Sequence, residues 1–421
     1  MNSPGLQIFI NNFGWLLFDK IVRMLLGVLV GAWVARYLSP GQFGQLSFAL
    51  AFVAVFTAIA NLGADGITVR DIAINRSVAS EILGTAAYVR TMAGLTCLAI
   101  AIPSAAIINR ANAHQIWLVA IVGTTLVIQA GDTVDLWFQS NSQSKRTVVA
   151  KLIAYLFSNG VKVGLILIRA PLIAFALVFV LDSVMASVAL YVAYRRFPAE
   201  GKWRVTNQRA HQLLRECRPF MIGGFLIVLY LRIDQIMLKQ LLGERALGIY
   251  ASAIWLLQIW QVIPAALATS LGPYVARKKA ANVVIYRETL IIAFRVFFFA
   301  GLSGMLVTYF LAPLLIHIFF GDAYSEAVPA MRAYSITLPF YFLSFAHNLW
   351  LTNEGRYMVR VYGAVTAGIC TVVVIFLFYR KLGILSACVA AIVSQFTAYF
   401  LINALLDKQA FRMQINAILF R

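Results

Sequence analysis

Charged residues are scarce in this chain. Asp, Glu, Lys and Arg together make up only 12% of its 421 residues, about half the density of a soluble globular domain. Together with a hydrophobic fraction of 62%, this shortage excludes a soluble protein and predicts one embedded in a membrane. Acidic residues are the scarcer sign: 16 stand against 35 basic residues, which gives a net charge of +19.

Cysteine and histidine are also few, with four residues of each. Three of the cysteines lie in apolar segments, so no disulfide framework is expected. The scattered histidines form no HExxH or paired Cys/His metal spacing. The sequence contains neither a Walker loop nor a GxSxG nucleophile elbow. The pattern therefore predicts neither an enzyme nor a bound cofactor or metal. Residues 1–12 lack the features of a cleaved signal peptide.

What the sequence does contain is a series of long apolar segments. A membrane-spanning helix takes about 20 apolar residues, and twelve segments qualify. They are 13–37, 42–63, 81–108, 115–138, 147–168, 171–194, 218–242, 246–275, 288–319, 327–351, 357–379 and 382–406. The sequence thus predicts an all-α polytopic membrane protein of about twelve helices. Pro313 is expected to kink or end the ninth span.

A polar stretch from Arg195 to Arg218 divides these spans into six and six. A short internal repeat supports the division: the segment Leu38–Gly44, LSPGQFG, is similar to Leu242–Gly248, LGERALG, which lies 204 positions later. We therefore predict an N-terminal lobe (1–200), a cytoplasmic linker (201–217) and a C-terminal lobe (218–421). Two lobes of six helices with the same orientation predict a pseudo-two-fold axis along the membrane normal, with a substrate site between them.

Basic residues favour one set of loops. That set holds 21 of the 35 basic residues, the opposite set holds 6, and 8 lie within the spans. By the positive-inside rule the first set is cytoplasmic, and both termini lie on that side. Because such loops also attract anionic lipid headgroups, the net charge requires no nucleic acid partner.

Charged residues within the spans are the most informative feature for function. The basic ones are Lys20, Arg23, Arg90, Lys162, Arg232, Lys239, Arg295 and Arg332, and the acids include Asp19, Asp132, Asp135, Asp182 and Asp234. One such charge at a helix centre costs roughly 2.5–3.5 kcal/mol on insertion scales. Buried ion pairs would account for some of them. Because three positive charges remain after full pairing, we predict a wet, cationic cavity and an anionic substrate.

The positions of these charged residues along the helices predict different roles for them. Asp19 and Arg23 are four apart, so they share a helix face and are expected to pair, whereas Lys20 points elsewhere. Arg90 and Lys239 are placed to snorkel toward headgroups.

Three further basic residues are candidates for the cavity. Lys162 lies among small and polar residues that suit a cavity wall, and Arg295 has no acid near it in sequence. Arg232 and Asp234 are two apart, so they point to different faces of the seventh span. The candidate substrate-binding residues are Lys20, Arg23, Lys162, Arg232 and Arg295.

Several motifs resemble those of the polysaccharide transport family, the O-antigen (Wzx-type) flippases of lipid-linked oligosaccharides. They are ARYLSPGQFG at 35–44, NLGAD at 61–65, DLWFQ at 135–139, RIDQIML at 232–238 and GIYAS at 248–252. The resemblance implies a two-lobed transporter that moves an undecaprenyl-pyrophosphate glycan across a bacterial inner membrane by alternating access. The resemblance also implies that Arg23 and Arg232 lie in the central cavity. It is compatible with other polysaccharide assembly proteins as partners.

Two further points remain open in the sequence. Asp19 and Asp234 are candidates for coupling transport to H⁺ or Na⁺, because an acid that pairs with a base in only one state changes its ion affinity between states. The alternatives are a multidrug exporter of the same superfamily, which the basic surplus disfavours, and a membrane glycan polymerase or ligase, which the short outward loops disfavour.

Overall fold

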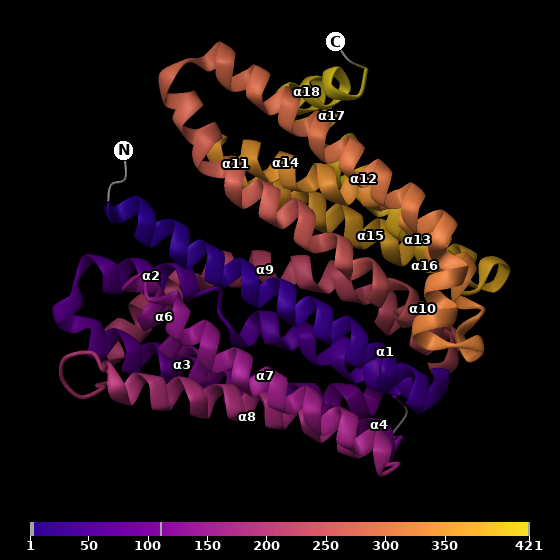
Figure 1. Cartoon of the computed structure of the whole chain (residues 1–421), viewed down its shortest axis with the longest axis horizontal. Helices are drawn as coiled ribbons and strands as arrows, with labels where there is room; N and C mark the ends of the chain where they lie inside the picture. The colour runs from indigo at the N-terminus through magenta and orange to yellow at the C-terminus, as the bar shows by residue number, and fades with distance from the viewer. Residues whose placement is uncertain (1–3, 110–111, 420–421) are drawn as a thin grey trace. The chain divides into compact units, whose positions relative to one another are not determined.

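The computed structural model describes residues 4–109 and 112–419, without the side chains of residues 4–13, 16, 17 and 357. Two basic residues used to predict orientation, Arg110 and Arg421, lie outside this range, as do the first three residues of the N-terminal segment. Helices make up nearly all of the described chain, and none of it forms a strand (Figure 1). The all-α prediction is confirmed.

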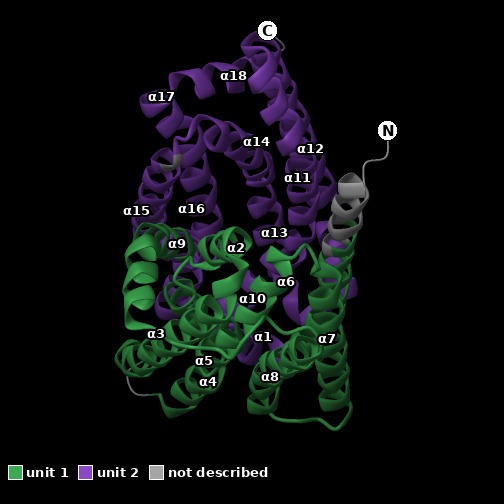
Figure 2. Cartoon of the chain, turned by 90° about the vertical axis from the view of Figure 1, so that its left-hand side faces the viewer, with its two compact units in different colours: residues 1–38, 45–228 green, residues 39–44, 229–421 purple. Residues whose placement is uncertain are grey.

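Contacts divide the chain into two units, shown in different colours in Figure 2. The first unit comprises 1–38 and 45–228, and the second comprises 39–44 and 229–421. The first half of the chain contains α1 (Pro4–Ala60), α2 (Asp65–Ile74), α3 (Ala79–Ile108), α4 (Ala113–Gly123), α5 (Thr125–Ile128), α6 (Thr133–Ser140), α7 (Ser144–Leu167) and α8 (Leu172–Arg196). The second half contains α9 (Asn207–Leu242), α10 (Glu244–Leu257), α11 (Val262–Ala281), α12 (Val283–Phe320), α13 (Ala327–Ser335), α14 (Leu338–Glu354), α15 (Tyr357–Leu382), α16 (Leu385–Phe396), α17 (Ile402–Leu406) and α18 (Lys408–Leu419).

Ten segments of the described chain are long and apolar enough to cross a membrane. The longest, Phe18–Ile74, holds two spans because the backbone turns sharply at Ser39, whose φ is 65°. A further span consists of α13 and α14, which are separately too short to be counted. These additions give the predicted twelve spans of a multi-pass membrane protein.

The polar stretch in the middle of the sequence is only partly a loop. Helix α9 begins at Asn207 and continues to Leu242, so within the predicted linker 201–217 only residues 201–206 are non-helical. The change from the first unit to the second falls inside this helix, between Val228 and Leu229. The first turns of α9 pack on α2 and α3, where Leu213 and Cys217 share an apolar cluster with Leu62 and Val89.

The structure bears on two local predictions. Of the two outcomes expected at Pro313, a kink or a helix end, the end is excluded: α12 continues to Phe320, since neighbouring groups in a membrane bundle can satisfy the carbonyl that proline frees. Arg90 does not snorkel: it is only 3% exposed and forms an ion pair with Asp65 at the start of α2. Asp65 is 25 positions away in sequence, so helix periodicity gave no sign of this partner.

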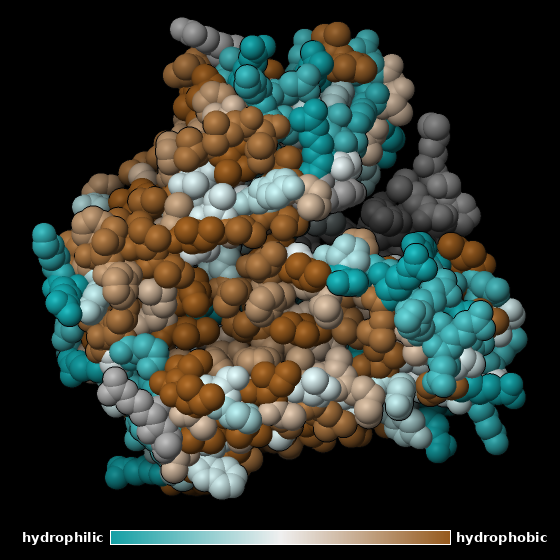
Figure 3. Space-filling model, turned by 180° about the vertical axis from the view of Figure 1, so that it is seen from behind, coloured by the Kyte–Doolittle hydropathy of each residue, from teal (hydrophilic) through white to brown (hydrophobic). Residues whose placement is uncertain are grey.

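Large apolar side chains cover much of the surface, and in the view of Figure 3 hydrophilic residues gather toward the margins of the face shown. Trp33 is 55% exposed, Leu167 78% and Phe310 72%. In water such a surface would promote aggregation, whereas lipid tails accommodate it without cost. The helices therefore present the lipid-facing surface that the composition predicts.

Candidate functional site

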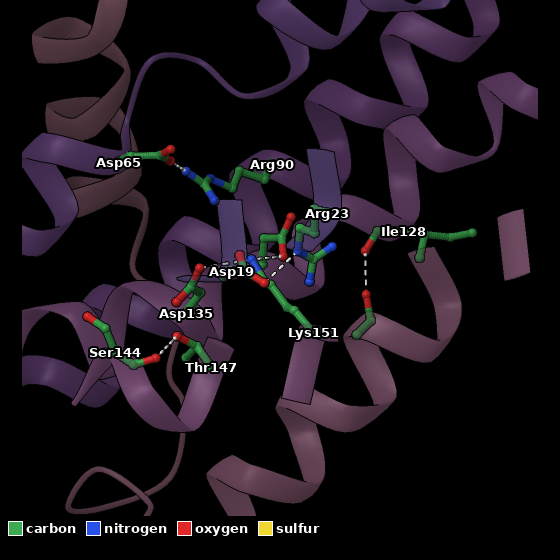
Figure 4. A network of polar contacts seen from close by, with 11 residues as sticks. Asp19, Arg23, Asp65, Arg90, Ile128, Asp135, Ser144, Thr147 and Lys151 are labelled. Atoms are coloured by element: carbon green, nitrogen blue, oxygen red, sulfur yellow. Dashed lines mark hydrogen bonds and ion pairs between the residues drawn. The ribbon is translucent and has the colours of Figure 1, made fainter. Parts of the chain in front are cut away.

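Helix α1 contributes an acid–base pair to the first unit. Asp19 and Arg23 stand one helical turn apart, and their side chains meet with Arg23 Nε 2.7 Å from Asp19 Oδ1 (Figure 4). This confirms the predicted pair. The arginine side chain is 27% exposed and the aspartate side chain 18%, so the pair is largely shielded from solvent. Lys20 is exposed, in agreement with its different helix face.

Helix α7 meets this pair with Tyr155. The Tyr155 hydroxyl donates a hydrogen bond to the backbone carbonyl of Arg23 at 3.1 Å, and the Arg23 guanidinium lies over the tyrosine ring, 4.8 Å from its centroid. Gly27, one turn beyond Arg23, leaves room for this contact, since a Cβ there would lie 2.8 Å from the Tyr155 hydroxyl oxygen. The arginine is thus held by the carboxylate of its own helix and by the ring of another.

The same face of α7 continues with Asn159 and Lys162, four and seven positions after Tyr155. Asn159 is 4% exposed and donates from Nδ2 to the Tyr155 carbonyl at 2.7 Å. Lys162 Nζ lies 4.8 Å from the centroid of the Phe179 ring on α8. We call Asp19, Arg23, Tyr155, Asn159 and Lys162 the polar seam of the first unit.

Helix α8 runs beside α7 (Figure 1) and adds one acid to the neighbourhood. Asp182 follows Phe179 by three positions, and its charge acts on both Lys162 and Tyr155. It forms no ion pair with Lys162 within 4.0 Å among the described residues. The seam therefore carries two basic residues, of which, within the described part of the chain, only Arg23 forms an ion pair.

Two buried polar atoms of the seam have no hydrogen-bond partner among the residues that the structure describes. They are Nη2 of Arg23 and Oδ1 of Asn159. Buried polar atoms in folded proteins are nearly always satisfied. A charged donor and a neutral acceptor without partners can bind a ligand that offers the opposite groups.

A second polar cluster stabilises the interrupted fourth span. That span changes from α5 to a 3₁₀ turn, Gln129–Asp132, and then to α6. Ser187 of α8 donates to the freed carbonyl of Ile128 at 3.2 Å. Lys151 of α7 lies 2.8 Å from Asp132 Oδ1 and 2.8 Å from Asp135 Oδ2 (Lys151 and Asp135 are labelled in Figure 4). The two acids are three positions apart in sequence, and both form an ion pair with the same lysine.

The remaining candidates lie in the second unit. Asp234 is 8% exposed; it accepts a hydrogen bond from the Tyr250 hydroxyl at 2.5 Å and one from the Gln235 amide at 2.7 Å. Arg232 is half-buried and forms no ion pair with Asp234 within 4.0 Å. The two residues therefore follow the predicted division between helix faces.

Arg295 has a structural contact that the sequence did not reveal. From α12 its Nε donates to the carbonyl of Ala417 at 3.3 Å, near the C-terminal end of α18. A cation at this end of a helix binds an otherwise unsatisfied carbonyl and the negative end of the helix dipole. The residue therefore helps to hold α18 against α12.

Sequence reasoning missed Tyr155 and Asn159. A signal was present, because Lys151, Tyr155, Asn159 and Lys162 recur every three or four positions and so lie along one face of α7. A polar stripe of this kind in a membrane helix faces protein or water rather than lipid.

Comparisons with known proteins agree with this architecture. Residues 9–279 match the family described as polysaccharide biosynthesis protein, and residues 219–380 match the MatE family. A comparison with curated proteins found no match.

Several solved structures share the fold. An inward-facing multidrug resistance MATE family transporter of the MOP superfamily matches with a TM-score of 0.76 at 14% identity, over 94% of each chain. The lipid II flippase MurJ in an inward closed conformation matches with a TM-score of 0.70 at 14% identity, over 96% of this chain and 90% of its own. A MATE protein in complex with MaD3S matches with a TM-score of 0.66 at 15% identity, over 100% of both chains. At such identities the likeness establishes the fold alone.

Twelve spans, the fold and the family matches together define the class of this protein: a multi-pass membrane transporter, not an enzyme. The first family match covers well over half of the sequence. The chain therefore belongs to the polysaccharide biosynthesis protein family. The transporter class removes the glycan polymerase or ligase as an alternative.

Proposed function

We propose that this transporter is a flippase that moves an undecaprenyl-pyrophosphate-linked oligosaccharide, an O-antigen or exopolysaccharide repeat unit, across a bacterial inner membrane. The family membership supports the substrate class. The observation that carries the proposal is the environment of Arg23, a largely buried guanidinium oriented by Asp19 and Tyr155. Its Nη2 donor has no hydrogen-bond acceptor among the described residues.

Phosphate is the ligand chemistry that such a group fits best. A guanidinium presents its N–H groups in a planar fork that matches two oxygens of a phosphate. Lys162 would add a point charge from the same seam, and Lys20, Arg232 and Arg295 stay candidates for further contacts. The glycan would occupy the wet interior, the lipid tails would remain in the bilayer, and alternating access would complete the transfer. Both termini are proposed to face the cytoplasm, where other polysaccharide assembly proteins would meet the transporter.

The second candidate function is multidrug export. It is favoured by the MatE match over residues 219–380. A cationic drug would, however, approach the two basic residues of the polar seam, and this like-charge contact is unfavourable in a medium of low dielectric constant. The two functions predict substrates of opposite charge, which an experiment can separate.

Purified protein in proteoliposomes should translocate a fluorescent polyprenyl-pyrophosphate glycan between leaflets and should not export a cationic dye. The measurement is the fraction of glycan label that becomes accessible to an added quencher or glycosidase, against empty liposomes as the control. Transport of the dye without transport of the glycan would replace the flippase by an exporter.

Ion coupling of the cycle is proposed to involve Asp234 and Asp19. Asp234 is a buried carboxylate whose described partners are a hydroxyl and an amide, and an unpaired buried charge is costly unless it takes up an ion. Asp234→Asn is therefore expected to make transport insensitive to an imposed H⁺ or Na⁺ gradient. A tenfold gradient supplies about 1.4 kcal/mol per ion, and that contribution should be lost.

The matched control for ion coupling is Asp322→Asn. Asp322 is also in the second unit, but its side chain is 91% exposed. Initial rates would be compared with and without each gradient. Gradient-stimulated transport that persists in Asp234→Asn, in Asp19→Asn and in the double variant would refute coupling through these acids.

A further inference from the structure

Asn159 presents an acceptor that its own surroundings leave unused. Its Nδ2 donates to the Tyr155 carbonyl at 2.7 Å, whereas Oδ1 is buried and bonds to no residue in the described part of the chain. The residue is only 4% exposed. The unmatched oxygen therefore belongs to the interior of the first unit rather than to its outer surface.

The orientation of this amide is fixed by chemistry. The Tyr155 carbonyl can only accept, so the NH₂ group of Asn159 must face it. A rotated amide would place two oxygens against each other and lose the hydrogen bond. Oδ1 is consequently the atom left without a partner among the described residues, and it requires a donor.

Tyr155 connects this acceptor to the arginine. Its carbonyl binds Asn159, its hydroxyl binds the Arg23 carbonyl and its ring lies under the Arg23 guanidinium. Arg23 Nη2 is the second unmatched atom of the seam. One residue thus positions a cationic donor and a neutral acceptor, each buried and each without a described partner.

We propose that Arg23 and Asn159 form one subsite for a sugar phosphate, in which Arg23 binds a phosphate oxygen and Asn159 Oδ1 accepts from a hydroxyl or N–H group of the adjoining sugar. The inference rests on the proposed function, because it places the glycan's first sugar beside the pyrophosphate. It adds Asn159 as a residue that determines specificity and Tyr155 as a positioning residue.

Simpler ligands fit this pair less well. A fully ionised phosphate has no donor for Asn159, and a metal cation attracted to Oδ1 would be repelled by Arg23. A neutral sugar supplies the donor but leaves the guanidinium without a counter-charge. A sugar phosphate satisfies both atoms at once.

The test compares three probes on the full-length protein in nanodiscs by ligand-observed NMR, which detects weak binding. The probes are N-acetylglucosamine 1-phosphate, glucose 1-phosphate and inorganic phosphate. Wild type is expected to prefer at least one sugar phosphate to inorganic phosphate. Asn159→Ala should weaken that sugar phosphate by roughly five- to tenfold and leave inorganic phosphate unchanged, as expected for the loss of one neutral hydrogen bond.

Matched variants complete the comparison. Arg23→Ala should weaken all three probes together, since it removes the shared phosphate contact. Ser158→Ala is the control: Ser158 is fully buried on the same helix, but its hydroxyl is already satisfied by the Ala154 carbonyl at 2.9 Å. It should change neither affinity nor preference. Melting temperatures would show that each variant is folded.

Two results would overturn the subsite. One is equal weakening of sugar phosphate and inorganic phosphate by Asn159→Ala, and the other is a wild type without preference between them. Failure of the flippase proposal would give a different result. The wild type would not translocate the lipid-linked glycan, but it would still prefer a sugar phosphate, and Asn159→Ala would still lose that preference.

Discussion

Replacing Gly248 with alanine is expected to destabilise the second unit severely, and replacing Gly44 should do the same. Segment 39–44 belongs to the second unit and crosses the start of α10 there. A Cβ on Gly248 would overlap the Pro40 carbonyl oxygen and lie 3.0 Å from the Gly44 nitrogen. A Cβ on Gly44 would overlap the Glu244 carbonyl oxygen and lie 2.9 Å from the Gly248 nitrogen.

Backbone obstacles make this cost large. A side chain can rotate away from an added methyl group, whereas the carbonyls of Pro40 and Glu244 are held in helices. We expect a loss of about 3 kcal/mol for each variant, visible as a lower melting temperature and a smaller monodisperse fraction in detergent.

Gly41→Ala is the matched control for the crossing. It lies in the same segment, but a Cβ there would meet nothing within 4 Å, and alanine favours a helix more than glycine does. Its stability should equal or exceed that of wild type. Wild-type melting of Gly44→Ala and Gly248→Ala would show that the two helix starts do not approach as closely as described.

Transport is expected to be lost when Arg23 is replaced by alanine and to be poorly restored by lysine. The expected effect follows from the chemistry of the group: a hydrogen bond to a charged partner contributes about 1.5–3 kcal/mol, which corresponds to roughly 10- to 100-fold weaker substrate binding. Lysine keeps the charge but has no planar fork for two oxygens, and it cannot reproduce the stacked contact with Tyr155.

The measurement is glycan translocation in proteoliposomes as a function of substrate concentration. Arg36→Ala serves as the control, because Arg36 is an exposed arginine of the same helix that belongs to no site described above. If Arg23→Ala and Arg23→Lys, both folded, transported at the wild-type rate across the concentration range, Arg23 would be only a structural partner of Asp19.

The fold was largely predictable because its causes are local. A membrane-spanning helix requires about 20 apolar residues regardless of which helices pack against it, so twelve spans could be counted from the apolar segments of the sequence alone. The Asp19–Arg23 pair followed from a spacing of four positions on one helix. The motif at Leu38–Gly44 and its repeat at Leu242–Gly248 also proved structural: both contain a residue with positive φ, Ser39 at 65° and Gly243 at 88°, followed by the glycine of the crossing.

Partners distant in sequence decided the rest. Tyr155 meets Arg23 across 132 positions, Arg295 binds a carbonyl 122 positions away, and Arg90 is neutralised by an acid on another helix. The sequence by itself thus determined that the protein lies in a membrane, how many times the chain crosses it and which charged residues needed partners. Only the tertiary structure decided which partner each charge received, because helix packing brings together side chains that no periodicity relates.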